Sequence, residues 1–120
     1  MTGAHSQRKG ANGEREVVSI YRIVGFDARR NFGSGSQGGG DITGSIPDVP
    51  EVKRVKSLPA KLREWIGQAR EGAEGSGKPW CVWHRQDGDT WCVTIDAGHY
   101  IELLEDRETL RQYATAEGVK

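Results

Sequence analysis

The sequence predicts a mixed α/β fold in which a central β-sheet is flanked by helices, in the order α-β-β-β-α-β-β-α. Apolar residues repeat at helical spacing near the start of the chain and again in its middle, around Tyr21 and Trp65. Between and after them lie short segments bounded by glycine, proline or aspartate, which is typical of strands. With 120 residues and no internal repeat, the chain is expected to form a single domain over residues 1–120.

The first helix is expected to begin at Gly13, after a flexible basic segment over residues 1–12, and to stop at Gly25. A helical wheel places Glu14 on the apolar face and Glu16 off it. The apolar face consists of Val17, Val18, Tyr21 and Val24. A carboxylate at the start of that face either points toward the core or a cleft, or only stabilises the helix N-terminus through the dipole.

Three strands are expected next, over residues 26–32, 41–46 and 51–55, the last two forming a compact hairpin. Six glycines lie between Gly33 and Gly44. They predict a close approach of backbone or a tight turn, and because no GK[ST] follows they do not form a P-loop. Pro50 donates no ladder hydrogen bond, so the third strand is expected to start late or to lie at a sheet edge.

A second helix is expected over residues 58–74 and an acidic helical segment over 97–120. Between them, Asp87-Gly88 predicts a hairpin of strands 80–85 and 90–95, with Val82 opposite Val93. That register puts the two cysteines, Cys81 and Cys92, on the same face without facing each other, so both are expected to be reduced.

The formal net charge is zero but unevenly spread: residues 1–79 carry 13 Lys/Arg against 9 Asp/Glu, and residues 80–120 carry 4 against 8. The N-terminal part is therefore suited to an anionic partner. No apolar run is long enough for a membrane span, no secretory signal is visible, and two cysteines without paired histidines do not make a zinc site. We expect a cytoplasmic protein that does not enter a membrane.

Three acids and one lysine have the composition of a phosphodiester-hydrolysing site: Glu14, Asp41, Glu51 and Lys53. Two carboxylates at the ends of neighbouring strands repel each other unless they share a proton or a cation, and hard oxygen ligands suit Mg²⁺ or Mn²⁺. An amine two residues after Glu51 returns to the same strand face, where it can stabilise developing negative charge. Taken alone, E-x-K is also common as a solvated salt bridge on a strand.

The chain resembles the PD-(D/E)XK nuclease superfamily and, within it, the archaeal-type Holliday junction resolvases and their phage relatives. The matching segments cover about residues 6–95: RKGANGEREVV (8–18), GFDARR (25–30), GSGS (33–36), GGDITG (39–44), EVKR (51–54) and WIGQA (65–69). The resemblance implies a restriction-endonuclease-like fold, metal-dependent cleavage of four-way DNA junctions, a homodimer, and a phage or prophage source.

Residue by residue, the resemblance makes Glu14 the helix acid, Asp41 and Glu51 the metal-binding acids, Lys53 the catalytic lysine and the Val52 carbonyl a further metal ligand. It matches Ser34 to a serine near the scissile phosphate, Arg15 to a basic residue beside the helix acid, and Gln68 to a helix glutamine near the site. Ser36, in the same segment as Ser34, is expected to contact DNA. The sequence alone also permits ordinary loop composition for both serines and a solvated helix edge for Gln68.

Basic residues that neutralise phosphates without reading sequence are concentrated in the N-terminal part. They are Arg8, Lys9, Arg15, Arg29, Arg30, Lys53, Arg54 and Lys56. The sequence lacks a recognition helix, a zinc finger and an aromatic RNA-binding motif, so recognition of DNA shape is favoured over reading of bases. Two alternatives remain: a nuclease of the same superfamily with another substrate, restriction-like or in repair, or a non-catalytic DNA-binding module.

Overall fold

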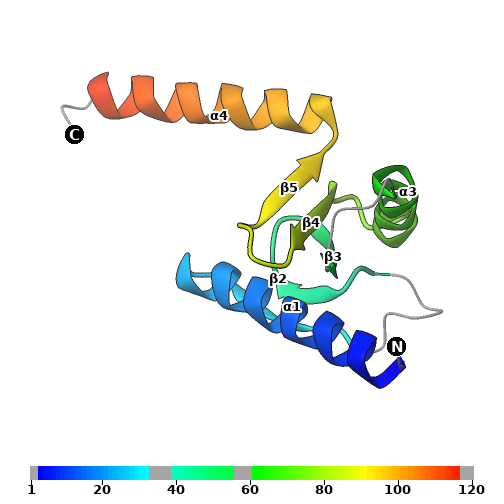
Figure 1. Cartoon of the computed structure of the whole chain (residues 1–120). Helices are drawn as coiled ribbons and strands as arrows, with labels where there is room; N and C mark the ends of the chain where they lie inside the picture. The colour runs from blue at the N-terminus through cyan, green and yellow to red at the C-terminus, as the bar shows by residue number, and fades with distance from the viewer. Residues whose placement is uncertain (1–2, 33–38, 56–60, 117–120) are drawn as a thin grey trace.

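The computed structural model describes residues 3–32, 39–55 and 61–116, with side chains from residue 8 onward. Across these residues the expected mixed α/β class and the expected order of elements are confirmed (Figure 1). The elements are α1 (Gly3–Ile23), β1 (Asp27–Arg30), β2 (Ile42–Ser45), β3 (Val49–Val55), α3 (Leu62–Ala73), β4 (Trp80–Gln86), β5 (Cys92–Ile95) and α4 (Ala97–Ala116).

The strands form two small sheets. β1 and β2 pair antiparallel, whereas β3, β4 and β5 form a mixed sheet in that order, parallel between β3 and β4 and antiparallel between β4 and β5. Helix α1 packs against β1 and β3, and α3 packs against β3 and β4. Because β3 contacts both helices, its alternate side chains face different layers.

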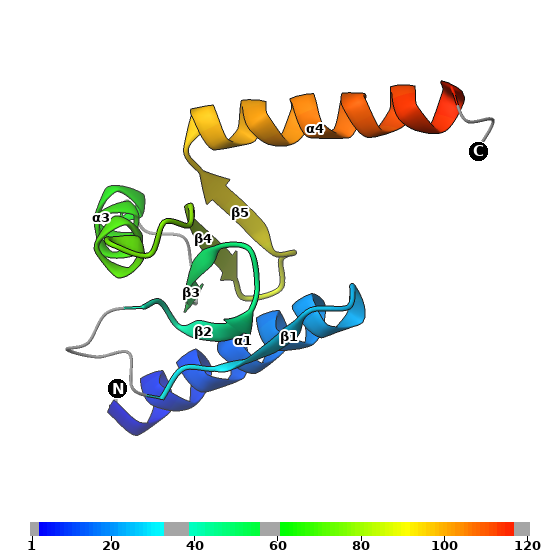
Figure 2. The same cartoon turned by 180° about the vertical axis from the view of Figure 1, so that it is seen from behind.

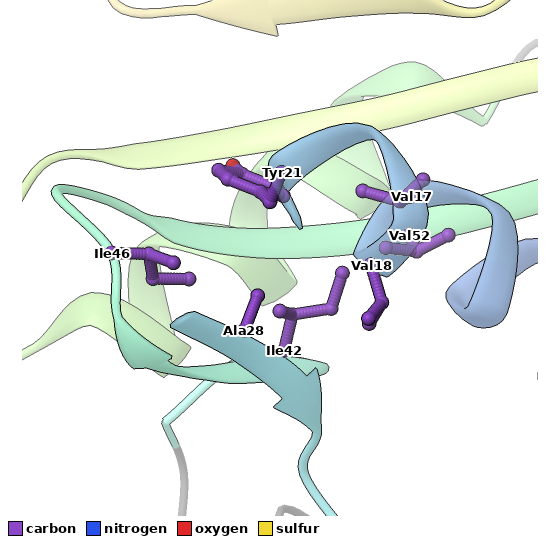
Figure 3. Close-up of a cluster of buried hydrophobic side chains, with 7 residues drawn as sticks. All are labelled: Val17, Val18, Tyr21, Ala28, Ile42, Ile46 and Val52. Carbon is purple, nitrogen blue, oxygen red and sulfur yellow. The ribbon is translucent and has the colours of Figure 1, made fainter. Parts of the chain in front are cut away.

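The main core lies beneath α1 (Figure 3). It joins α1 to β1, β2 and β3 through seven buried side chains: Val17, Val18, Tyr21, Ala28, Ile42, Ile46 and Val52. A second cluster on the α3 side contains Trp65, Ala69 and Val82, with Val55 packed against it. Val52 and Val55 therefore belong to different layers, as the expected strand alternation requires.

The expected helix start at Gly13 is wrong, because α1 already begins at Gly3. Two contacts explain why the helix extends across the sheet. The Lys9 Nζ lies 2.6 Å from Asp87 Oδ2 in the β4–β5 turn. Gly13 is buried, and a Cβ there would lie 3.1 Å from the Arg54 Cβ, so the helix backbone lies directly on β3.

Two further expectations about strand pairing are corrected. Strands 41–46 and 51–55 do not form a hairpin, since β2 pairs with β1 and β3 pairs with β4. β3 also begins at Val49 rather than late, and it includes Pro50. β3 can include this proline because it lies at the edge of the three-stranded sheet, where the missing N–H of Pro50 costs no hydrogen bond to a neighbouring strand.

The β4–β5 hairpin is shifted by one residue from the expected register. Val82 lies opposite Thr94, and Trp83 lies opposite Val93. The Asp89 N–H donates to the Gln86 carbonyl at 3.1 Å, which leaves one extra residue on the β5 side before pairing begins. The shift puts the two cysteines on opposite faces: Cys81 is buried, Cys92 is exposed, and both are free, as expected.

Helix α4 extends away from the rest of the chain, on the far side of β5 from α1, in both views of the molecule (Figures 1 and 2). None of its described side chains is buried. Its large exposed apolar residues are Tyr100, Ile101, Leu103, Leu104, Leu110 and Tyr113.

Candidate active site

Asp41 is fastened to β3 by its backbone and by its side chain. Its N–H donates to the Pro50 carbonyl at 2.8 Å, and its Oδ2 accepts the Val52 N–H at 2.8 Å. The two bonds flank Glu51 in the sequence of β3, so Asp41 lies against this strand close enough for the Glu51 charge to act on its carboxyl group. The sequence placed both acids at strand ends, but the contact forms between the two sheets rather than within a hairpin.

Gly40, which has no side chain, lets the backbone before Asp41 lie directly against β3. Gly40 has a φ of 69°, and a Cβ there would lie 2.7 Å from Val49 Cγ1 and 2.8 Å from the Pro50 oxygen. Helix α3 closes the other side, where the Gly39 N–H donates to the Gly72 carbonyl at 3.0 Å. Close backbone approach, one of the two roles expected of the glycine-rich segment, is therefore observed at Gly40.

Lys53 lies beside Glu51 on β3. Its Nζ is 3.2 Å from Glu51 Oε2, and the two side chains are 24% and 15% exposed. Residues two apart on a strand share a face, so this ion pair follows directly from the E-x-K spacing. The lysine ammonium is therefore next to Glu51, its charge also acts on Asp41, and it keeps donors available for an incoming anion.

Burial and, second to it, the charge of the neighbouring Glu51 carboxylate raise the pKa of Asp41 to about 6. The Val52 N–H opposes this shift by stabilising the ionised form, Glu14 adds a smaller upward effect, and Lys53 a downward one. A half-buried acid beside a second carboxylate is the electrostatic situation that a bound cation relieves.

Glu14 and Glu16 have different partners although both lie near the middle of α1. The Arg30 Nε lies 2.9 Å from Glu14 Oε1, and the Glu14 charge acts on Asp41. Glu16 instead binds Arg54 at 3.2 Å and Arg85 at 3.1 Å, near the β4–β5 hairpin. The charge of Glu14 thus reaches Asp41, whereas Glu16 is bound to arginines near the β4–β5 hairpin.

The remaining expected site residues are spread more widely. Arg15 and Arg30 line a groove along α1 and β1, whereas Arg8 and Lys9 line a separate hollow of about 290 Å³ with Asn12 and Arg54. Gln68 is exposed on α3, one turn before Gly72, and makes no hydrogen bond to the acids among the residues that the structure describes. Ser34, Ser36 and Lys56 lie outside the described residues.

Asn31 supports the acid pair, and no sequence pattern predicts this role. Its backbone N–H donates to the Asp41 carbonyl at 2.9 Å, and its side-chain amide donates to the Gly40 carbonyl at 3.1 Å. No sequence signal distinguishes this asparagine from an ordinary turn residue. Its role depends on β1 and β3 lying on either side of residues 40 and 41.

The donor chemistry of the acid pair fits a hard divalent cation. Within the described parts of the chain, no group of three or more His, Cys, Asp or Glu side chains is placed to hold a metal ion. Mg²⁺, however, is commonly held by one or two carboxylates and completes its shell with water and substrate oxygens. Asp41 and Glu51 supply those two carboxylates, and the electrostatics at Asp41 favour a cation there.

Comparison with solved structures finds chains of similar fold. The crystal structure of Archaeoglobus fulgidus Hjc, a Holliday junction resolvase from an archaeal hyperthermophile, is similar with a TM-score of 0.54 and 28% sequence identity, covering 68% of this chain and 72% of that one. The mixed sheet with flanking helices is the restriction-endonuclease-like fold of that protein. Neither the protein-family models nor the curated proteins contain a match.

Among the described helices, none is long and apolar enough to cross a membrane.

Proposed function

We propose that the protein is a metal-dependent endonuclease that resolves four-way DNA junctions. The single observation that carries the proposal is the convergence of Asp41, Glu51 and Lys53, in which two hydrogen bonds between Asp41 and β3 hold the first acid in place. The likeness to an archaeal Holliday junction resolvase supports branched DNA as the substrate. Mg²⁺ is the proposed cofactor, with Mn²⁺ as a substitute.

Each residue has a separate task in this proposal. Asp41, Glu51 and the Val52 carbonyl would hold the cation, which when bound supplies Lewis-acid polarisation of the phosphate and a more acidic water. The Lys53 ammonium stabilises negative charge that develops on the phosphate oxygens. Glu14 positions Arg30 through their 2.9 Å ion pair, so that Arg30 contacts the DNA backbone beside the acids.

The proposed DNA contacts beyond the acids are Arg8, Lys9, Arg15, Arg30, Ser36, Lys56 and Gln68, with Ser34 near the scissile phosphate. A homodimer with two active sites would match the two-fold symmetry of the junction. The exposed apolar side chains of α4 support self-association, because such residues are costly in water. The cytoplasm of a bacterial or phage-infected cell is the proposed location.

Four-way junctions are expected to bind far better than linear duplex of equal length. Affinity for both should fall with salt, because phosphate contacts release counterions. The difference between them should survive, since it arises from the spacing of two sites and the bend of the junction. A competition titration at two salt concentrations, followed by mapping of the nicks and light scattering for the dimer, tests this.

Paired nicks at symmetric positions on opposing strands are the expected products. Equal affinity for duplex and junction, or a single nick made by a monomer, would contradict the resolvase function. It would leave a nuclease of another substrate class, because the acid pair does not depend on the branch. Absence of cleavage on junction, flap, duplex and single-stranded DNA, with binding intact, would indicate a non-catalytic DNA-binding module.

The pair Glu14→Gln and Glu16→Gln separates catalysis from stability. Glu14→Gln should reduce cleavage at saturating metal, because it weakens the hold on Arg30 and removes a charge that acts on Asp41. Glu16→Gln should mainly lower the melting temperature, since it loosens Arg54 and Arg85. Cleavage rates and thermal melts of both variants check this; equal, mild effects would show that Glu14 serves only its helix.

A further inference from the structure

A basic groove with one exposed aromatic ring runs along α1 and β1. The hollow has a volume of about 510 Å³ and is lined by Arg15, Arg22, Arg29, Arg30 and Phe32, together with two small α1 residues. None of the described residues that line it is acidic. Its size is within the range of pockets that hold a small ligand. The groove is therefore positively charged and large enough to hold a nucleotide.

The arginines retain donors for a ligand. The Arg22 Nε–H donates to the Ala28 carbonyl at 2.8 Å, and one Nη–H of Arg15 donates to Asn12 Oδ1 at 2.9 Å. A guanidinium has five N–H donors, so most remain available. Arg29 is exposed and has no ion-pair partner among the described residues. Of the four arginines that line the groove, only Arg30 has a carboxylate partner among the described residues. The charges of Arg15, Arg22 and Arg29 are therefore uncompensated in that part of the chain.

Phe32 adds a second kind of contact. Its side chain is 83% exposed, and the Arg30 Cζ lies 4.6 Å from the centroid of its ring. An exposed phenyl ring gains nothing from water, whereas an aromatic base stacking on it is favourable. The Arg30 guanidinium covers one face of the ring, and the other face is left for a base of a ligand that binds the groove arginines.

We infer that this groove binds an unpaired nucleotide of a DNA strand, with its phosphates on Arg22 and Arg29 and its base stacked on Phe32. A nucleotide is the ligand that offers an anion and an aromatic face together. A base inside a duplex is already stacked, so the strand must be locally unpaired, as at a branch point. The inference rests on the proposed function and deepens it by naming the part of the substrate that is recognised.

The groove adjoins the acid pair through Arg30. This residue lines the groove, and it also forms the 2.9 Å ion pair with Glu14, whose charge acts on Asp41. In this proposal, a strand that lies on the groove arginines continues past Arg30 toward Asp41 and Glu51. Unpaired DNA next to the scissile phosphate would explain a preference for branched over continuous duplex, since only a branch supplies it without further melting.

The test is a binding titration of the full chain in EDTA, so that no cleavage occurs. The probes are a short single strand carrying the fluorescent base 2-aminopurine, the same strand fully paired, and a four-way junction with that base at the branch. Phe32→Ala should weaken single-strand binding about 5- to 150-fold and remove the quenching of the probe. Phe32→Tyr should restore both, and the duplex affinity should stay near that of the wild type.

Arg29→Ala tests the phosphate contact, with Arg107→Ala on the exposed face of α4 as the matched control. Arg29→Ala should reduce the slope of log affinity against log salt by about 0.7 on the single strand, the value for one lost phosphate contact. Arg107→Ala should leave the slope unchanged. Unaltered binding by both Phe32→Ala and Arg29→Ala, or an equal loss with Arg107→Ala, would overturn the inference.

Two outcomes separate this inference from the proposed function. If the wild type cleaves junctions with metal and Phe32→Ala binds every probe normally, the groove inference is refuted and the proposed nuclease function stands. If the chain binds single strands through Phe32 but cleaves no substrate, the groove inference stands and the proposed nuclease function is refuted. Displacement of the strand by an equal concentration of free mononucleotide would overturn the assignment to a DNA strand.

Discussion

Asp41→Asn is expected to abolish cleavage of branched DNA while DNA binding stays nearly unchanged, and Glu51→Gln should do the same. Each substitution removes one carboxylate charge from the proposed cation site and keeps the shape of the side chain. Loss of a metal-based contribution of several kcal/mol to the transition state corresponds to at least about 10³-fold in rate. Single-turnover cleavage at saturating Mg²⁺ measures the rate, and gel-shift titration in EDTA measures binding.

Two further variants make this result specific. Asp27→Asn alters an exposed acid at the start of β1 and should cleave normally. Lys53→Ala should slow cleavage strongly while Mn²⁺ binding, measured by calorimetry, persists, because the lysine is assigned to the phosphate and not to the cation. Near-normal cleavage by Asp41→Asn or Glu51→Gln would refute the metal site, and collapse of metal binding in Lys53→Ala would refute the role of the lysine.

The residues that meet at β3 were predictable from sequence because their positions follow from local rules. Glu51 and Lys53 share a face because strand side chains alternate with a period of two, and their 3.2 Å ion pair follows from that spacing. Glu14 and Glu16 were separable because a helix turns by a fixed angle per residue. Asp41 follows a glycine whose freedom to adopt a φ of 69° allows the close contact with Pro50.

What the sequence did not predict depends on contacts between distant segments. The partner of β2 is β1 and not β3, because the loop at Asp41 bonds to Pro50 and Val52 across two sheets. The register of β5 shifts by one residue through the conformation of the turn, which a D-G signal alone does not determine. The groove escaped prediction for the same reason, since Arg22 and Phe32 come together only when β1 packs on α1.

Asp41→Asn is also expected to stabilise the metal-free protein at neutral pH. The Asp41 pKa is raised from 3.8 to about 6 in the folded chain, so folding disfavours the ionised carboxylate. Below about pH 4 the side chain is protonated in both states and costs nothing. Between about pH 4 and 6 the unfolded state loses its proton first, so the wild type loses stability as the pH rises.

Above pH 6 the penalty is constant, at most about 3 kcal/mol for a shift of about two pKa units. Asparagine cannot ionise, and its amide oxygen can still accept the Val52 N–H that Asp41 Oδ2 accepts at 2.8 Å. Urea unfolding in EDTA at pH 3.5 and pH 7.5 should therefore show a gain for Asp41→Asn that is present only at the higher pH. Asp27→Asn, at an exposed acid, serves as the control variant. Saturating Mg²⁺ should then stabilise the wild type more than Asp41→Asn, because a bound cation compensates a charge that the variant lacks. A gain of equal size at both pH values would mean that asparagine merely packs better, and the electrostatic origin of the cation site would be refuted.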